Sequence, residues 1–222
     1  TQLVQVLQDT GTTPPAPPNG APPSGSPGAA NGATTTNSVL TSTCGVYRLD
    51  AGGAVSAADQ AYASSEADQS AACLINAANL TLTNPTITKT GDSSSSDQSS
   101  FFGLNAAVLV GSGSQLTISG GSVEADGVGA NGVFSTGEGS SVTLSDMIIN
   151  AVGDGAHAVM ATVGGTMILN NVDMNTTDVH SGAIATDRGS GTITATGGTV
   201  TTSGADSPGI YSTGKISVND AT

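Results

Sequence analysis

Few side chains in this sequence are of a type that performs catalysis, and they are scattered. The basic residues are Arg48, Lys89, Arg188 and Lys215. A polysaccharide lyase or hydrolase needs clustered carboxylates, usually with Arg or Lys as the base or charge stabiliser. Arg188 follows Asp187 in ATDRG, and we interpret the two as a surface ion pair at a corner. No nucleophile elbow, P-loop or dinucleotide fingerprint is present. We therefore expect no catalytic residues, no enzyme activity and no organic cofactor.

Four aspartates recur at intervals and are the candidates for a metal site: Asp126, Asp154, Asp178 and Asp206. If they stacked on one edge they would repel one another unless a cation or proton intervened. Ca²⁺ takes several oxygen ligands, so a weak calcium site is one reading, and solvated loop carboxylates are the other. His157 and His180 have no Cys or His at ligand spacing, which argues against a transition-metal site.

Two covalent modifications are suggested by the sequence. Cys44 and Cys73 are the two cysteines, and in a Lys-poor, Ser/Thr-rich chain they favour one disulfide formed in an oxidising compartment. Two buried free thiols remain the alternative. Asn79-Leu-Thr81 and Asn175-Thr-Thr177 fit the N-glycosylation pattern, although chance matches are expected in such a composition.

Composition restricts the class of protein. The 222 residues carry a net charge of −13, which argues against nucleic acid and against anionic membrane surfaces. There is no Trp, with three Phe and three Tyr, but there are 31 Gly, so a thin solenoid or a disordered chain is expected rather than a compact core. No apolar run approaches the roughly 20 residues needed to span a membrane. No signal segment opens the sequence, so an exported protein would begin at Thr1 after cleavage.

From Leu80 onward the sequence repeats itself, and this decides for the solenoid. Equivalent apolar positions are Leu82, Ile118, Leu144, Leu169, Ala195 and Val218, at steps of 36, 26, 25, 26 and 23 residues. A period in this range is the signature of stacked units. Each unit has two apolar residues two apart, as in Leu116 and Ile118, which point to the same side of a strand.

Each unit continues with a corner and two further strands. The corner residues are of types that tolerate positive φ: Asn84, Gly120, Asp146, Asn171, Gly197 and Asp220. A second apolar position follows at Ile87, Val123, Ile149, Met174 and Val200. A third strand ends the unit, as in Ala106–Val110 and Gly132–Phe134. The sequence therefore predicts an all-β fold, a right-handed three-sided parallel β-helix with apolar ladders inside.

The boundaries of the solenoid depend on two segments. Asp68–Ile75 matches the third-strand pattern, so 46–76 is expected to be a first coil with a Cys44–Cys73 staple. The alternative for 56–74 is an amphipathic capping helix opened by Ser56-Ala-Ala-Asp59. Gly91–Ser100, GDSSSSDQSS, accounts for the long step and is expected to bulge from one face as a loop.

The start of the chain has a different character. Residues 1–10 contain a short apolar β segment with Leu3, Val4, Val6 and Leu7, and 11–39 form a Pro/Gly/Ser/Thr-rich linker before the β-helix of 40–222. The segment is either a frayed terminus or an assembly strand that pairs with another subunit.

The segments GLNAAVLVGSGSQLTISGG, GANGVFSTG, SGAIATDRG and SPGIYSTG resemble secreted bacterial right-handed parallel β-helix proteins, which are adhesin-like or uncharacterised and share the pectate-lyase-like helix architecture. The resemblance covers roughly 47–222 and implies a secreted or cell-surface location. It carries no catalytic residue over. In such proteins the helix usually runs on for more coils, whereas this sequence stops inside a coil, as a fragment would or as a chain completed by something else.

These observations lead to three hypotheses of function. The first is an extracellular structural or adhesive surface protein that self-assembles head to tail into filaments through the N-terminal strand and the β-helix ends. The second is a carbohydrate-binding or carbohydrate-active β-helix, with surface glycans as partners. The third comes from the outward column Thr81, Thr117 and Thr143, because a regular Thr array can order water and bind ice, although Ile168 interrupts the column.

Overall fold

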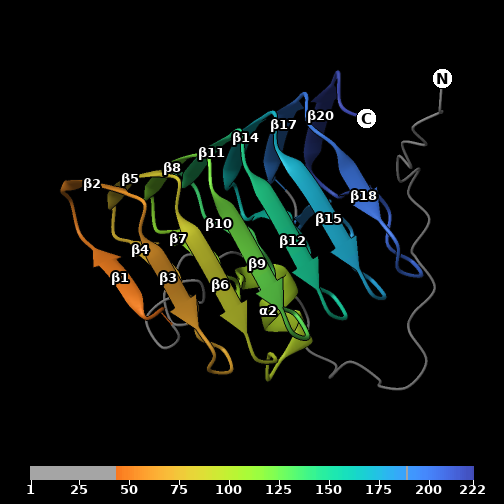
Figure 1. Ribbon diagram of the computed structural model, residues 1–222, viewed down its shortest axis with the longest axis horizontal. Coiled ribbons are helices and arrows are strands. Elements are labelled where there is room, and N and C mark those ends of the chain that lie inside the picture. Colours follow the sequence, from red (N-terminus) through yellow and green to blue (C-terminus); the bar gives the residue numbers. More distant parts are fainter. Residues whose placement is uncertain (1–43, 189) are drawn as a thin grey trace, which may run out of the picture.

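A computed structural model describes residues 44–188 and 190–222, which form a parallel β-solenoid of three seven- or six-stranded sheets (Figure 1). Sheet A contains β1 (Tyr47–Asp50), β4 (Ala72–Ile75), β7 (Val108–Gly111), β10 (Val133–Thr136), β13 (Val159–Thr162), β16 (Ile184–Asp187) and β19 (Ile210–Ser212). Sheet B contains β2 (Ala54–Ala58), β5 (Asn79–Thr83), β8 (Gln115–Ser119), β11 (Ser141–Ser145), β14 (Thr166–Asn170), β17 (Thr192–Thr196) and β20 (Lys215–Asn219). Sheet C contains β3 (Ala61–Ser64), β6 (Thr86–Thr90), β9 (Ser122–Asp126), β12 (Ile148–Val152), β15 (Asp173–Thr177) and β18 (Val200–Thr202). The predicted all-β, three-sheet class is confirmed.

The apolar ladders lie in the predicted register. In sheet B, Ile118 is level with Leu82 on one side and with Leu144 on the other, and all three side chains are buried. Leu169 and Ala195 continue the ladder. Because side chains alternate along a strand, this register turns every second residue of sheet B inward, where it packs against the inward residues of sheets A and C.

The corners between sheets B and C are made by left-handed residues, as the sequence predicts. All six predicted corner residues have positive φ, between 49° for Asn84 and 71° for Gly120. Asn and Asp tolerate this conformation because their short side chains hydrogen-bond locally. At one corner the Asn171 amide also donates to Asp146 Oδ1 at 2.8 Å, so consecutive corners are tied together.

The first turn of the solenoid is formed by β1, β2 and β3. The alternative of an amphipathic helix over 56–74 is wrong, because Ser56 lies in β2 and its inward neighbours Val55 and Ala57 pack on the ladder of sheet B. The Cys44–Cys73 disulfide is present, with 5.4 Å between the Cα atoms, so the free-thiol alternative is excluded. It joins the segment before β1 to β4 of the next turn. The expected strand at 1–10 and linker at 11–39 lie outside the described residues.

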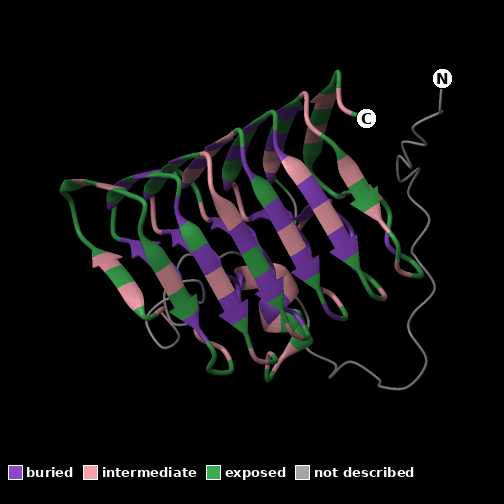
Figure 2. Ribbon diagram, in the orientation of Figure 1, coloured by how far each residue is buried: buried purple, intermediate pink, exposed green. Residues whose placement is uncertain are grey.

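Burial changes along the axis of the solenoid (Figure 2). Middle turns are buried inside, whereas the inward residues of the end turns are only half-buried. At the β1–β3 end, the Tyr47 and Tyr62 rings meet edge to face with centroids 5.0 Å apart. At the other end, Ile216 and Val218 of β20 and Val200 of β18 are half-buried. The interior therefore opens at both ends of the described part.

The long step in the repeat forms a helix rather than only a loop. α2 (Ser96–Phe102) begins after Ser95, whose side chain accepts from the Gln98 backbone N–H, and ends at Gly103 with φ of 76°. These residues are a standard N-cap and a left-handed C-terminal glycine. Instead of bulging freely, the segment packs on sheet A, whose outward residues form a second apolar cluster that includes Leu109, Phe134 and Met160. This is why the middle strands of sheet A are buried on both faces.

Candidate functional site

A buried chain of hydrogen bonds joins α2 to successive turns beside sheet A. The Asn131 amide donates to the Ser99 carbonyl at 3.2 Å, and the His157 backbone N–H donates to Asn131 Oδ1 at 2.9 Å. His157 Nδ1 lies 2.8 Å from the Gly182 carbonyl oxygen. Burial lowers the pKa of His157, so the ring is neutral and donates through Nδ1. His157 therefore helps to hold successive turns of the solenoid together.

A second buried polar group is Lys89, which faces inward at a position that Ala125 and Ala151 occupy in later turns. Its Nζ donates to the carbonyl oxygens of Glu66 at 3.0 Å and Gly91 at 3.2 Å, and also to that of Thr90. Burial lowers the pKa of Lys89, although nearby carboxylates act in the opposite direction. The ammonium lies where the segment carrying α2 leaves the solenoid, so it holds that junction.

Arg188 does not form the predicted ion pair with Asp187. The Asp187 carboxylate instead accepts from the backbone N–H of Arg188 at 2.6 Å, and the guanidinium carbon lies 3.5 Å from the centroid of the Phe101 ring. Arg188 has φ of 54°, which turns its side chain away from its neighbour and toward α2. A planar guanidinium stacks well on an aromatic face, and this contact replaces the expected pair.

The four aspartates considered for calcium do not form a column. Asp126 ends β9 and is level with Val152, whereas Asp154 lies in the corner after β12 and pairs with His180 at 2.9 Å. Asp178 accepts from its own neighbour, the backbone N–H of Val179. Within 44–188 and 190–222, no three His, Cys, Asp or Glu side chains form a group that could hold a metal ion. Calcium binding stays a prediction, because these aspartates do not form a ligand set in the described residues.

The described residues do not assemble a nucleophile with a base. His157 bonds to backbone and amide groups, and His180 bonds to Asp154, so neither histidine contacts a Ser or Cys side chain. Asp154 and His180 are both well exposed, with 50% and 65% of their side-chain surface accessible.

The outer face of sheet C carries a ladder of polar side chains. The Asn150 amide donates to Glu124 Oε1 at 2.8 Å, and the Asn175 amide donates to Asn150 Oδ1 at 2.9 Å. The nitrogen of the candidate glycosylation site Asn175 is therefore engaged in the ladder. Asn79, the other candidate, is exposed on the outer face of sheet B, and its amide makes only a 3.4 Å contact with Gln115. Of the two, Asn79 is the better placed to accept a glycan.

The outer face of sheet B is a regular surface, and we call it the hydroxyl face. It consists of the outward residues of the seven strands, in three columns. The first column is Ala54, Asn79, Gln115, Ser141, Thr166, Thr192 and Lys215. The second is Ser56, Thr81, Thr117, Thr143, Ile168, Thr194 and Ser217. The third is Ala58, Thr83, Ser119, Ser145, Asn170, Thr196 and Asn219. The predicted outward Thr column is thus confirmed, and the sequence reasoning missed that it has two polar neighbours.

In comparison with known proteins, no family model, no curated protein and no solved structure matches this chain. The helix that the structure describes is too short and too polar to cross a membrane.

Proposed function

We propose that this chain is an extracellular structural rod that associates end to end with further copies of itself. The observation that carries the proposal is the pair of open ends, where each strand of the first turn, and β19 and β20 of the last, has one neighbouring strand in the described part. Unpaired backbone groups at a sheet edge are a template for another strand, and half-buried apolar residues beside them gain from being covered.

The two ends are complementary in their backbone groups. The Asp59 N–H donates to Thr83, so by alternation Ser56 and Ala58 turn their backbone groups to the open side of β2. The Lys215 N–H donates to Gly191, so Ile216 and Val218 turn theirs to the open side of β20. A second copy placed with its β2 beside β20 would continue the parallel register of sheet B.

The side chains at the two ends also suit one another. In that register the ladder of Ala195 and Val218 continues with Ala57 of the next copy. In sheet C the ladder of Met174 and Val200 continues with Tyr62, which is half-buried. Such contacts are apolar and head to tail, and head-to-tail contacts that do not close into a ring give filaments.

The extracellular location is supported by the disulfide and the net charge rather than by a targeting sequence. The Cys44–Cys73 disulfide is of the kind that persists in oxidising compartments. The net charge of −13 suits a solvated surface protein. The resemblance to secreted adhesin-like β-helix proteins points the same way, and adhesion by the sides of the rod is compatible with assembly through its ends.

The test is the length of the particles that the full chain forms. Sedimentation velocity and negative-stain microscopy over a range of concentrations should show rods that lengthen with concentration. Ser56→Pro removes an N–H that faces the open side of β2 and leaves the N–H groups that pair with β5, so it should give short, separate rods. Ser56→Ala is the matched control and should still assemble.

Two outcomes separate the possible routes of assembly. If deletion of 1–10 abolishes the filaments, the pairing strand is the segment with Leu3, Val4, Val6 and Leu7. If the filaments persist, the turns of neighbouring copies stack directly on one another. A wild-type chain that stays monomeric at every concentration, or filaments that Ser56→Pro does not shorten, would overturn the proposal.

A further inference from the structure

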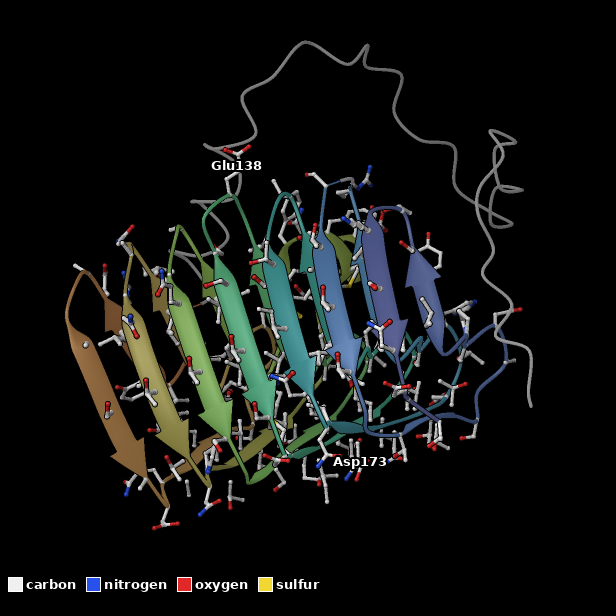
Figure 3. All side chains as sticks on the ribbon, turned by 90° about the horizontal axis from the view of Figure 1, so that it is seen from above. Glu138 and Asp173 are labelled. Carbon is white, nitrogen blue, oxygen red and sulfur yellow. A yellow bond between two sulfur atoms is a disulfide. The ribbon has the colours of Figure 1, made fainter. Side chains whose placement is uncertain are left out.

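The hydroxyl face has a composition that sets it apart from the rest of the molecule. Its outward residues are Ser, Thr, Asn or Gln at every position except Ala54, Ala58, Ile168 and Lys215. Figure 3 looks onto this face, with the strands of sheet B side by side. Polar, uncharged groups therefore cover the outward positions from β5 to β17, with Ile168 as the one interruption among them.

The hydroxyl groups in the central column have no hydrogen-bond partner within the described part of the chain. Thr81, Thr117, Thr143 and Thr194 make no side-chain hydrogen bond to any residue of 44–188 or 190–222. On the outer face of sheet C, by contrast, Asn150 and Asn175 bond to their neighbours in a ladder. These central-column hydroxyls are therefore available to bond to something outside the described part, whereas Thr166 and Ser145 in the flanking columns bond within it.

Carboxylates are absent from the three columns, although the whole chain carries 17 Asp and Glu residues. Glu138 and Asp173 lie at opposite margins of the face, one in the turn before β11 and the other in β15 beyond the corner that follows β14 (Figure 3). Lys215, on the last strand, is the one charged side chain in the columns. Charges order water around themselves and disrupt any other arrangement, so their placement at the margins leaves the face compatible with a regular water layer.

The face is also regular in two directions. Neighbouring strands are spaced by about 4.8 Å, and successive outward residues of a strand by roughly 6.6–6.8 Å. Thr is branched at Cβ, which restricts χ1, so its methyl and hydroxyl groups hold fixed positions. Ile168 is exposed and also branched at Cβ, so it preserves the methyl at its position in the Thr column but carries an ethyl group in place of the hydroxyl.

We infer that the hydroxyl face adsorbs to ice, with Thr117, Thr143 and their column neighbours as the contact residues. A glycan-binding surface would be expected to have aromatic platforms, and no Tyr or Phe lies in the three columns. A second copy of the chain would need apolar surface to bury, and the face offers only Ile168 as a large apolar side chain. Rows of hydroxyls and methyls at regular spacings suit a partner that is itself a lattice of water.

The experiment measures incorporation of the fluorescently labelled full chain into a slowly growing ice hemisphere, together with thermal hysteresis. The wild type should concentrate in the ice and depress the freezing point below the melting point. Thr117→Tyr places a bulky ring in the centre of the face and should reduce both signals several-fold. Thr177→Tyr, on the exposed end of β15 in sheet C, is the matched control and should leave both unchanged.

Circular dichroism and thermal unfolding establish that both variants are folded. Exclusion of the wild type from ice overturns the inference, as do equal signals for folded Thr117→Tyr and Thr177→Tyr. Binding of the wild type to insoluble cellulose or chitin that depends on Thr117, without uptake into ice, would assign the face to a neutral glycan and also overturn it. Assembly through the ends leaves sheet B uncovered, so this result does not depend on filament formation.

Discussion

The Nδ1 atom of His157 lies 2.8 Å from the carbonyl oxygen of Gly182, which belongs to the next turn of the solenoid. The ring is buried, and its backbone N–H is held by Asn131, which also binds the last turn of α2 through Ser99. A neutral imidazole is thus one element of a polar network that connects the helix with successive turns.

Acid should weaken the fold through His157. Its pKa in the folded chain is lowered by burial from the ordinary 6.5, so its stabilisation is complete above the unfolded value and is lost as pH falls below it. We expect the free energy of unfolding, measured by denaturant titration, to fall between about pH 7 and pH 5. His157→Gln should flatten this slope, and His180→Gln, at an exposed position, should not. Equal slopes in the two variants would contradict the assignment.

Removing the buried ammonium should loosen the junction of the α2 segment. Lys89→Met keeps the length of the side chain but leaves the Glu66 carbonyl without its donor, while the Gly91 carbonyl keeps only the Asn105 amide, which donates to it at 2.8 Å. We expect a loss of about 1–3 kcal/mol in the free energy of unfolding. The control is Lys215→Met on exposed β20, which should change stability by less than about 0.5 kcal/mol. If Lys89→Met is as stable as the wild type, the ammonium does not hold the junction.

A carboxylate placed in the ladder of sheet C should create a pH-dependent defect. Asn150→Asp removes the donor to Glu124 and puts a second negative charge beside it. Like charges raise the carboxyl pKa in the folded state, so the deficit relative to the wild type is present at neutral pH and shrinks as pH falls through about 4. Thermal unfolding at neutral pH and at about pH 4 measures the deficit. Asn150→Ser lacks the charge, and its deficit should not change with pH.

Reduction of Cys44–Cys73 should destabilise the first turn. The bridge closes a segment with a sequence separation of 29 and ties the chain before β1 to β4. A loop of this size predicts a loss of about 2–4 kcal/mol on reduction. Denaturant unfolding with and without a reductant checks it, and Cys44→Ser should have the lower stability in both conditions. Unchanged stability of the wild type on reduction would show that the first turn does not need the bridge.

The repeat could be predicted because the same residue types recur at equivalent positions of successive turns. Leu82, Ile118 and Leu144 are apolar at every turn, since each must fill the same interior space, and Asn84 and Asp146 are types that accept positive φ. The three sheets and their register follow from these two signals. The hydroxyl face could be predicted only in its central Thr column, because the columns beside it mix Ser, Thr, Asn and Gln and show no obvious repeat.

The covering of sheet A could not be predicted from the same signals. GDSSSSDQSS has no apolar periodicity, and the short α2 is formed by its caps at Ser95 and Gly103 and by packing on sheet A. One signal for it exists: Ala106 to Val110 is apolar without alternation, which is typical of a strand buried on both faces. Arg188 is a similar case, since its contact with Phe101 joins residues that are far apart in the sequence.

Two adjacent glycines at one corner should respond very differently to substitution. Gly197 and Gly198 have φ of 68° and 75°, but a Cβ on Gly197 would lie 3.8 Å from the nearest atoms of Asn171, whereas one on Gly198 would lie 2.2 Å from the Val172 carbonyl oxygen. The turn below must therefore shift to admit any side chain at 198. Gly197→Asn introduces the residue type that stands at this corner in Asn171, which has φ of 54°, so it should change the free energy of unfolding by less than about 0.5 kcal/mol.

Gly198→Ala combines a left-handed alanine, which costs about 1–2 kcal/mol, with overpacking against the neighbouring turn, which adds about 1–3 kcal/mol. Denaturant unfolding of the two variants beside the wild type measures the difference directly. The two positions share nearly the same backbone conformation, so Gly197→Ala bears the same left-handed cost without the overpacking, and its comparison with Gly198→Ala isolates the close approach of one turn to the next. Equal losses at 197 and 198 would mean that the turns are not stacked as closely at this corner as the 2.2 Å approach requires.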